Sequence, residues 1–340
     1  MKTTDRPVCI FLGSKEKIRT VYNSDITDAL VKSAEIDADK VFTREDVIAA
    51  PEVFSETKYI FSTWGMPAFS REEISLCFPK LSAVFYAAGS VRSFAAPFLE
   101  SGVKVFSAWA ANAVPVAEFT VSEILLANKG YFKGIHTFSE TRSKKSAALS
   151  CREYPGNYGI SVGLIGCGMI GSMVAGRLVD IGIDVLVFDP FLDEAKALNL
   201  GVKKVELEDI FSGCSVISNH LANNPQTIDM LNYSLFSLMP KNSTFINTGR
   251  GAQVDEPDLI RFLVERPDVT ALLDVTYPEP PAKDSPLFDL ENVILTPHIA
   301  GSMGNEVWRM AEYMLKEFRC YISGEPTKYS VSLKMLETMA

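Results

Sequence analysis

A glycine-rich turn between an apolar run and a helical pattern constrains the fold of this chain more than any other feature. The turn reads Gly166-Cys167-Gly168-Met169-Ile170-Gly171, follows the apolar run 160–165 and opens a predicted helix over 169–181. In a strand–turn–helix unit the first glycine permits a tight turn, the second lets the backbone approach a pyrophosphate, and the third lets helix and strand pack closely. The helix then offers free N–H groups and its positive dipole end to the phosphates.

An acidic residue stands where a ribose would be bound. Asp189 directly follows the next predicted strand, 184–188, and lies 18 residues past Gly171. Its carboxylate would accept hydrogen bonds from an adenosine ribose and repel a 2′-phosphate. No arginine occurs in 190–192 to pair with such a phosphate. The glycine turn and Asp189 together predict NAD as the cofactor, with NADP less favoured. The alternatives are that the glycine motif is only a tight turn and that Asp189 is only a surface cap.

Short apolar runs alternate with helical periodicity along the chain, which is typical of α/β proteins with parallel sheets. The expected strands are 8–12, 59–62, 83–87, 103–106, 160–165, 184–188, 216–219, 244–247, 269–273 and 293–295. The expected helices include 71–77, 115–129, 169–181 and 302–323. Ser70, with Glu73 three residues later, predicts a capping box at the start of the first of these helices.

The order of these elements in 340 residues predicts two Rossmann-like domains, each a doubly wound parallel sheet, with a cleft between them. Residues 1–112 plus 302–340 are expected to form a substrate domain, and residues 113–301 an NAD-binding domain. The segment 130–158 is polar and basic and lacks strand runs. It is expected to be a dimerisation arm or a linker, although such a charge run by itself usually means a solvated face.

Composition excludes several classes of protein. The net charge is −9, from 33 Lys and Arg against 42 Asp and Glu, so a nucleic-acid or anionic-membrane partner is disfavoured. The six cysteines are scattered without a C-x-x-C or a Cys/His cluster, which argues against a disulfide framework and a metal site. The sequence has no secretory leader pattern and no run of about 18 apolar residues. A cytoplasmic location is expected.

The chain has three histidines, so each can be weighed as a catalyst. His136 lies in the predicted arm and is expected to be structural or exposed. His220 follows the predicted strand 216–219, where cofactor pockets form. His298 follows the last predicted strand within Thr296-Pro297-His298-Ile299-Ala300-Gly301. A lone histidine is more often structural than catalytic, so the neighbouring motifs decide its interpretation.

Five motifs occur in order over roughly 80–305. They are Asn112-Ala113-Val114-Pro115-Val116-Ala117-Glu118, the glycine turn with Asp189, Ile246-Asn247-Thr248-Gly249-Arg250-Gly251 with Val254-Asp255-Glu256, Leu273-Asp274-Val275 leading to Pro278-Glu279-Pro280, and 296–301. In this combination the chain resembles the D-2-hydroxyacid dehydrogenase family.

The resemblance implies that Arg250, Glu279 and His298 are the catalytic residues. A guanidinium can hold a carboxylate as a planar fork, and an imidazole paired with a carboxylate can donate and accept a proton near neutral pH. The resemblance also implies contacts with the nicotinamide end of the cofactor. The residues concerned are His220, Thr248, Gly249, Arg250, Asp274, His298 and Gly301.

The expected substrate site departs from the family. Relatives tend to have a glycine-rich loop ending in an acid after the strand 83–87, whereas this chain reads Ala88-Gly89-Ser90-Val91-Arg92. The N–H groups near Gly89 and Ser90 could hold a carboxylate. Arg92 is either a second anion-binding group or an exposed arginine, and Trp64 is either a wall of the substrate site or core packing. After His220, the chain also lacks the family's usual Leu-Pro pair.

The sequence thus predicts an NAD-dependent oxidoreductase that interconverts a 2-keto acid and a D-2-hydroxy acid, with His298 as proton donor and acceptor. We expect a homodimer acting on a small molecule. The alternative is an NAD(H)-sensing scaffold or corepressor-like protein with little turnover. A formate dehydrogenase would have Gln in place of Glu279, and a methyltransferase would share only the glycine turn.

Overall fold

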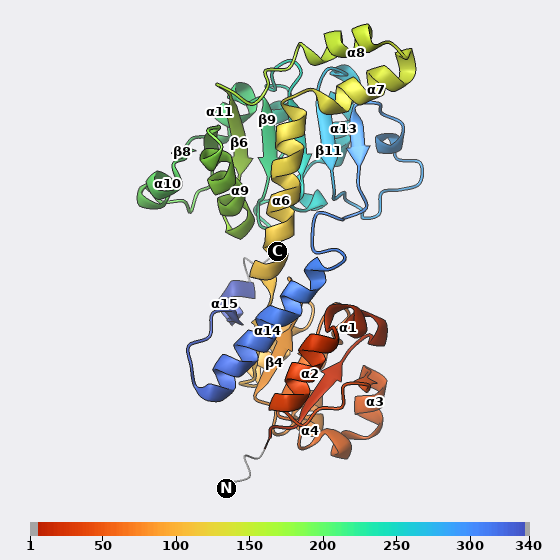
Figure 1. Ribbon diagram of the computed structural model, residues 1–340, viewed down its shortest axis with the longest axis vertical. Coiled ribbons are helices and arrows are strands. Elements are labelled where there is room, and N and C mark those ends of the chain that lie inside the picture. The colour runs from red at the N-terminus through yellow and green to blue at the C-terminus, as the bar shows by residue number, and fades with distance from the viewer. Residues whose placement is uncertain (1–5, 337–340) are drawn as a thin grey trace. The chain divides into compact units, whose positions relative to one another are not determined.

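The computed structural model describes residues 6–336, which divide into two compact units with separate sheets (Figure 1). Unit 1 consists of Met1–Asn112 and Ser302–Ala340, and unit 2 of Ala113–Gly301. Strands and helices alternate in both units, and each sheet has helices packed against it. The predicted class, two doubly wound α/β domains, is confirmed.

The sheet of unit 1 has the order β13-β5-β4-β3-β1-β2, and only β13 is antiparallel to its neighbour. The strand order changes direction at β1, because β2 lies on one side of β1 and β3 on the other. Ligands bind at such a point in doubly wound sheets, and β3 and β4 end beside it. The strands are β1 (Cys9–Leu12), β2 (Val41–Phe42), β3 (Tyr59–Ser62), β4 (Ala83–Tyr86), β5 (Lys104–Ser107) and β13 (Ser330–Val331).

An aromatic core joins the sheet of unit 1 to its last long helix. Phe61, Phe85 and Phe106 are buried on neighbouring strands, and Phe318 of α14 packs its ring against two of them. Figure 1 shows α14 lying across the face of this sheet. The helices are α1 (Lys15–Val21), α2 (Ser24–Ser33), α3 (Arg44–Ala49), η1 (Pro51–Phe54), α4 (Arg71–Cys77), α5 (Ala95–Glu100), α14 (Glu306–Ser323) and α15 (Leu333–Leu336).

The sheet of unit 2 is parallel throughout, with the order β12-β11-β10-β9-β6-β7-β8. The order of the strands reverses between β6 and β9: β7 and β8 follow on the side of β6, and β10 to β12 follow on the side of β9. The strands are β6 (Ser161–Ile165), β7 (Asp184–Phe188), β8 (Lys203–Lys204), β9 (Val216–Asn219), β10 (Thr244–Asn247), β11 (Thr270–Leu273) and β12 (Val293–Leu295).

Helices cover the sheet of unit 2, and two more helices form a hairpin. The hairpin consists of α7 (Tyr131–Thr141) and α8 (Lys144–Cys151), which pack on each other. The other helices are α6 (Trp109–Ala127), which begins in unit 1 and continues into unit 2, α9 (Met169–Asp180), α10 (Glu194–Leu200), α11 (Leu207–Gly213), α12 (Tyr233–Phe236), η2 (Gly251–Gln253), α13 (Glu256–Glu265) and η3 (Pro286–Phe288).

Three features differ from the sequence-based expectation. β2, β8 and β13 were not predicted, because a two-residue strand has too few residues to show alternation. α6 begins at Trp109 rather than at residue 115, with Pro115 inside it. Proline is usually tolerated only in a first helical turn, which is why the helix was expected to start there. α14 begins at Glu306 rather than at residue 302, since 302–305 precede the helix as turn residues.

α6 is the one described helix that is long and apolar enough to cross a bilayer by length and composition. Half of that apolar stretch is buried within the protein. Ala117, Ile124 and Ala127 belong to the core cluster that also contains Ile246 and Leu272 of the sheet. These contacts are those of a core helix.

Replacing Phe318 with alanine tests how α14 is attached to unit 1. The ring is fully buried between Tyr59, Phe61 and Phe85, so its loss should lower the free energy of unfolding by about 3–5 kcal/mol. Ile322→Ala on the same helix, at a side chain 41% exposed, should cost under about 1 kcal/mol. Urea unfolding followed by circular dichroism measures both; equal losses would contradict this packing.

Candidate functional site

The carboxyl edge of the unit 2 sheet gathers the residues singled out from the sequence. The reversal between β6 and β9 separates two halves of this edge. In sheets of this kind a dinucleotide lies across the reversal, with one mononucleotide on each side. Gly166 and Asp189 follow β6 and β7 and form the adenosine half. The residues that follow β9, β10, β11 and β12 form the other half, which we call the nicotinamide half.

The glycine turn leaves space for phosphate only at its centre. Gly166 has a φ of 94°, and a Cβ there would lie 2.7 Å from the carbonyl oxygen of His220. A Cβ on Gly171 would lie 2.1 Å from the Gly166 oxygen, so helix and turn touch at that point. A Cβ on Gly168 would meet no atom within 4 Å. Gly168 is also the N-cap of α9, which has no side-chain cap.

Asp189 supports this turn and retains capacity for a ligand. One carboxylate oxygen accepts a hydrogen bond from the Cys167 N–H at 2.6 Å, and the other accepts from the Phe191 N–H at 2.8 Å. Each oxygen can accept a second hydrogen bond. The open space at Gly168, the uncapped start of α9, with Met169 and Ile170 in its first turn, and this carboxylate fit a dinucleotide.

His220 is unsuited to proton donation. Its Nε2 lies 3.0 Å from the Ser218 hydroxyl, and burial lowers its pKa to about 4. The ring is therefore neutral at physiological pH. Its buried Nδ1 has no hydrogen-bond partner within residues 6–336, which makes it available to a bound molecule.

A network of buried amides fixes the turn after β10. The Asn219 side chain donates to Asn247 at 3.1 Å and to Gln253 at 2.6 Å. Asn247 Oδ1 accepts from the Gly249 N–H, and Gln253 Oε1 accepts from the Arg250 N–H. None of these three amide residues was predicted as part of the site. Asn219 and Asn247 end their strands, and a buried amide at such a position needs hydrogen-bond partners.

Gly251 brings the Arg250 turn against the segment after β11. A Cβ at residue 251 would lie 2.0 Å from the Thr276 carbonyl, so only glycine fits there. Arg250 donates to the Gly249 oxygen at 2.7 Å and is half-buried. Burial lowers the pKa of Arg250 and the Glu279 charge opposes this, so the two groups lie within electrostatic reach. A guanidinium stays charged under such a shift.

Glu279 and His298 form a direct pair. The Glu279 Oε1 lies 2.5 Å from the Nδ1 of His298, and about half of each side chain is exposed. With Nδ1 occupied by the carboxylate, Nε2 is the ring atom left to exchange a proton with a ligand. His298 has a φ of 56°, the left-handed conformation that non-glycine residues seldom adopt. Such strain is characteristic of functional sites.

Asp274 holds the loop that presents His298. Its Oδ1 accepts from the Thr296 hydroxyl at 2.6 Å and from the Ile299 N–H at 2.8 Å, and its Oδ2 accepts from the Ala300 N–H at 2.9 Å. Asp274 is 4% exposed. Its main observed contact is therefore with the 296–301 loop, which ends at Gly301, while Oδ2 retains capacity for a ligand.

The candidate substrate residues belong to unit 1 and are described separately. Ala88, Gly89 and Ser90 follow β4, and the Ser107 hydroxyl contacts the Ala88 oxygen at 2.9 Å and the Gly89 oxygen at 2.5 Å. The N–H of the next residue in a trans peptide points opposite to each carbonyl. The Gly89 and Ser90 N–H groups therefore point away from Ser107, and no hydrogen bond between described residues uses them.

Trp64 and Arg92 have different surroundings. Trp64 follows β3 and packs partly buried against the core of unit 1, which favours the packing interpretation. Arg92 is exposed. His136 lies on α7, and its Nε2 is 3.2 Å from Glu291 Oε2 at the surface. No group of three or more His, Cys, Asp or Glu within residues 6–336 is placed to hold a metal ion.

Comparisons with known proteins identify the family of this chain. Residues 126–300 match a sequence model described as D-isomer specific 2-hydroxyacid dehydrogenase, NAD binding domain. The chain is 29% identical over 240 residues to the D-3-phosphoglycerate dehydrogenase of Archaeoglobus fulgidus, covering 70% of this chain and 44% of that protein. It therefore spans less than half the length of this curated relative.

Solved structures share the fold over nearly the whole chain. A phosphoglycerate oxidoreductase from Rhizobium etli superposes with a TM-score of 0.81 at 21% identity, covering 97% of this chain and all of the other. The NAD-complexed D-isomer specific 2-hydroxyacid dehydrogenase of Lactobacillus delbrueckii ssp. bulgaricus gives 0.77 at 17% identity, covering 96% and 100%. At these identities the likeness shows the fold alone.

Two alanine substitutions on α9 test the phosphate-binding turn. Gly171→Ala should weaken NADH binding by at least about tenfold, because its Cβ would displace the Gly166 carbonyl. Gly176→Ala is the matched control, since a Cβ there meets no atom within 4 Å, and it should stabilise the helix by up to about 1 kcal/mol. Fluorescence titration with NADH measures the affinities. Equal binding by the two variants would refute the assignment.

Proposed function

Because the chain belongs to the D-isomer specific 2-hydroxyacid dehydrogenase family, we propose that it is an NAD-dependent enzyme interconverting a 2-keto acid and a D-2-hydroxy acid. The observation that carries this proposal is the 2.5 Å contact between Glu279 and His298 at the nicotinamide half of the edge. A paired imidazole there is a proton donor placed where a carbonyl would be reduced.

Arg250 binds the substrate carboxylate in this proposal. The guanidinium is planar and permanently charged, so two of its N–H groups can hold a carboxylate and orient the neighbouring carbonyl. The amide network of Asn219, Asn247 and Gln253 fixes the backbone beneath it.

His298 supplies the proton. NAD, when bound, provides and takes up the hydride. As the keto acid is reduced, negative charge grows on its carbonyl oxygen, and the Nε2–H of a protonated His298 neutralises it. Glu279 pairs with Nδ1 and so leaves Nε2 as the nitrogen that exchanges the proton with the substrate. In the reverse direction the neutral ring accepts the proton of the hydroxyl group.

The finer assignments rest on single features. NAD is preferred over NADP because Asp189 lies where a 2′-phosphate would be bound, and its carboxylate would repel it. The substrate is a small 2-keto acid, since a single arginine with a paired imidazole suffices to bind one. The six cysteines are free thiols, which suits the cytoplasmic location that we propose.

Replacing His298 tests the proposed chemistry. His298→Asn should lower NADH oxidation by about 10²–10⁴-fold with a 2-keto acid that the unaltered protein reduces, while NADH affinity is retained. Asparagine is chosen because it tolerates the left-handed backbone conformation of residue 298.

His136→Asn is the matched control and should keep full turnover, because its partner Glu291 lies outside the site. The screen covers glyoxylate, hydroxypyruvate, pyruvate and bulkier or doubly charged 2-keto acids. Retained turnover in His298→Asn would remove His298 as the acid. NADH binding without turnover of any acid would favour a scaffold instead.

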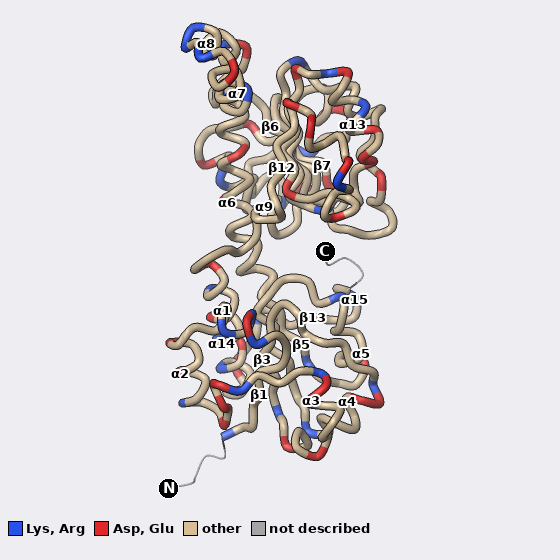
Figure 2. The backbone as a smooth tube through the Cα atoms, turned by 90° about the vertical axis from the view of Figure 1, so that its right-hand side faces the viewer, with Lys and Arg blue, Asp and Glu red and all other residues tan. Residues whose placement is uncertain are grey.

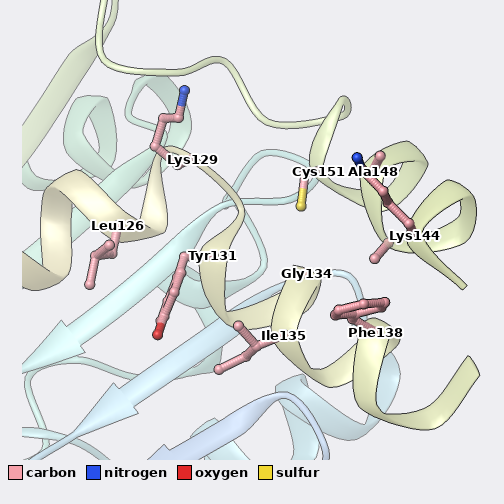
Figure 3. A pocket seen from close by; sticks show the side chains of 10 residues that line it. Leu126, Lys129, Tyr131, Gly134, Ile135, Phe138, Lys144, Ala148 and Cys151 are labelled. Carbon is pink, nitrogen blue, oxygen red and sulfur yellow. The ribbon is translucent and has the colours of Figure 1, made fainter. Parts of the chain in front are cut away.

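We also propose that the protein is a homodimer joined through the α7–α8 hairpin. Ile135 and Phe138 on α7 are 51% and 52% exposed. In Figure 3 these side chains border a groove that Lys144 and Cys151 of α8 also line. Figure 2 shows basic residues gathered on α8. An apolar groove with a charged rim is typical of subunit interfaces, and a second copy of this hairpin is its proposed occupant.

A charge placed in this groove tests the dimer. Phe138→Glu should shift the protein from twice the mass of one chain to the mass of one chain in size-exclusion chromatography with light scattering. Leu198→Glu is the control, because Leu198 is 81% exposed on α10, outside the hairpin, and should leave the dimer intact. If the unaltered protein is monomeric at micromolar concentration, the proposal is refuted.

A further inference from the structure

Thr120 on α6 contacts the turn that carries Arg250. Its hydroxyl oxygen lies 3.0 Å from the hydroxyl oxygen of Thr248, which is 128 residues further along the chain. Thr120 is fully buried, and Thr248 is 6% exposed. Thr248 is the first residue after β10 and is joined to Arg250 through Gly249. The contact therefore ties α6 to the start of this turn, at the nicotinamide half of the edge.

The packing of α6 explains why these two side chains meet. Alternate residues of a strand point to the same face of the sheet, so Thr248 continues the face of β10 that carries Ile246. Ile246 belongs to the same buried cluster as Ala117 and Ile124 of α6. Residues three or four apart share one face of a helix, which places Thr120 on the buried side of α6 with those two residues.

The hydrogen bonding of Thr120 is unusual for a threonine inside a helix. Such hydroxyls often donate to the carbonyl oxygen four residues earlier, as the Ser122 hydroxyl of the same helix does to Glu118 at 2.8 Å. Within residues 6–336 the Thr120 and Thr248 hydroxyls have no hydrogen-bond partner other than each other. The pair carries two hydroxyl hydrogens, and their contact uses only one of them.

The burial of Thr120 decides which hydroxyl is the donor. If Thr248 donated, the Thr120 hydrogen would be left inside the protein without an acceptor, which is unfavourable for a buried polar group. If Thr120 donates, the unused hydrogen belongs to Thr248, which follows β10 at the carboxyl edge. The second arrangement is therefore favoured. It makes the Thr248 hydroxyl a hydrogen-bond donor for a bound molecule, with its oxygen held in place by Thr120.

We propose that Thr120 is a positioning residue that orients the Thr248 hydroxyl as a hydrogen-bond donor to an oxygen at the nicotinamide end of the cofactor. Thr120 does not touch the cofactor and acts only through Thr248. The acceptor is an oxygen of the nicotinamide ribose or the oxygen of the carboxamide group, both of which are uncharged and accept hydrogen bonds. The inference rests on the proposed function, because it takes the nicotinamide end of NAD to lie at the carboxyl end of β10.

The experiment is a double-mutant cycle on NADH affinity, measured by isothermal titration calorimetry. Thr120→Val and Thr248→Val keep the shape of each side chain and remove its hydroxyl. Each should weaken NADH binding by about two- to tenfold, the size expected for the loss of one uncharged hydrogen bond. The double variant should bind NADH no more weakly than Thr248→Val alone, because Thr120 acts through the Thr248 hydroxyl.

Two control variants and two shorter ligands separate this role from a general disturbance of α6. Thr120→Ser retains a hydroxyl and should keep the NADH affinity of the unaltered protein. Ser122→Ala removes a hydroxyl that bonds only within its own helix and should have no effect. Adenosine diphosphate lacks the nicotinamide nucleoside and should bind every variant equally. ADP-ribose identifies the acceptor: weaker binding of ADP-ribose assigns the ribose oxygen, and a loss confined to NADH assigns the carboxamide oxygen.

Several outcomes overturn the inference. Additive losses in the double variant would do so, as would a loss of affinity for adenosine diphosphate equal to that for NADH. Unchanged NADH affinity in Thr248→Val would do so by itself, whether or not a Thr120 variant folds. If the unaltered protein does not bind NADH, the proposed function fails as well, whereas NADH binding that is insensitive to both threonines overturns only the role of Thr120.

Discussion

The carboxylate of Asp274 is the group on which the geometry of the site depends. It leaves the buried end of β11 and accepts three hydrogen bonds from the loop that contains His298. Hydrogen bonds to a charged group contribute about 1.5–3 kcal/mol each, more together than the roughly 1–3 kcal/mol that a left-handed residue costs. His298 can therefore be held in that conformation. Without these bonds its ring would have no fixed position relative to Glu279.

Parallel pairing explains how residues far apart in the sequence come to share one edge. Each strand of the unit 2 sheet delivers the residue after it to the same side, so Gly166, Asp189, Thr248 and Asp274 gather without long-range loops. The strand-order reversal between β6 and β9 then separates the proposed phosphate-binding turn from the proposed proton donor. This division lets a common cofactor site be combined with chemistry that depends on a few residues.

Much of the fold could be predicted from the sequence, because long apolar runs and the glycine turn are strong local signals. The strands at 59–62, 184–188, 216–219, 244–247 and 293–295 have the predicted bounds, and Ser70 and Glu73 form the expected capping box. The predicted start of α6 was wrong, because proline is typical of a first helical turn, whereas Pro115 lies inside this helix. The two-residue strands are defined by their pairing with neighbouring strands, and no local sequence pattern shows that pairing.

The site was predictable only in part. Motifs placed Arg250, Glu279 and His298 as candidates, and the structure brings the last two into contact, although their roles stay proposals. The amides of Asn219, Asn247 and Gln253 could not be singled out, because their importance comes from contacts between strands.

The most direct test of the account is a single reduction with labelled cofactor. The protein is given a 2-keto acid and NADH carrying deuterium at the transferable C4 position, and the product is examined by mass spectrometry and chiral chromatography. The account predicts a D-2-hydroxy acid with one deuterium at C2. An L product, or a D product without deuterium, would contradict it.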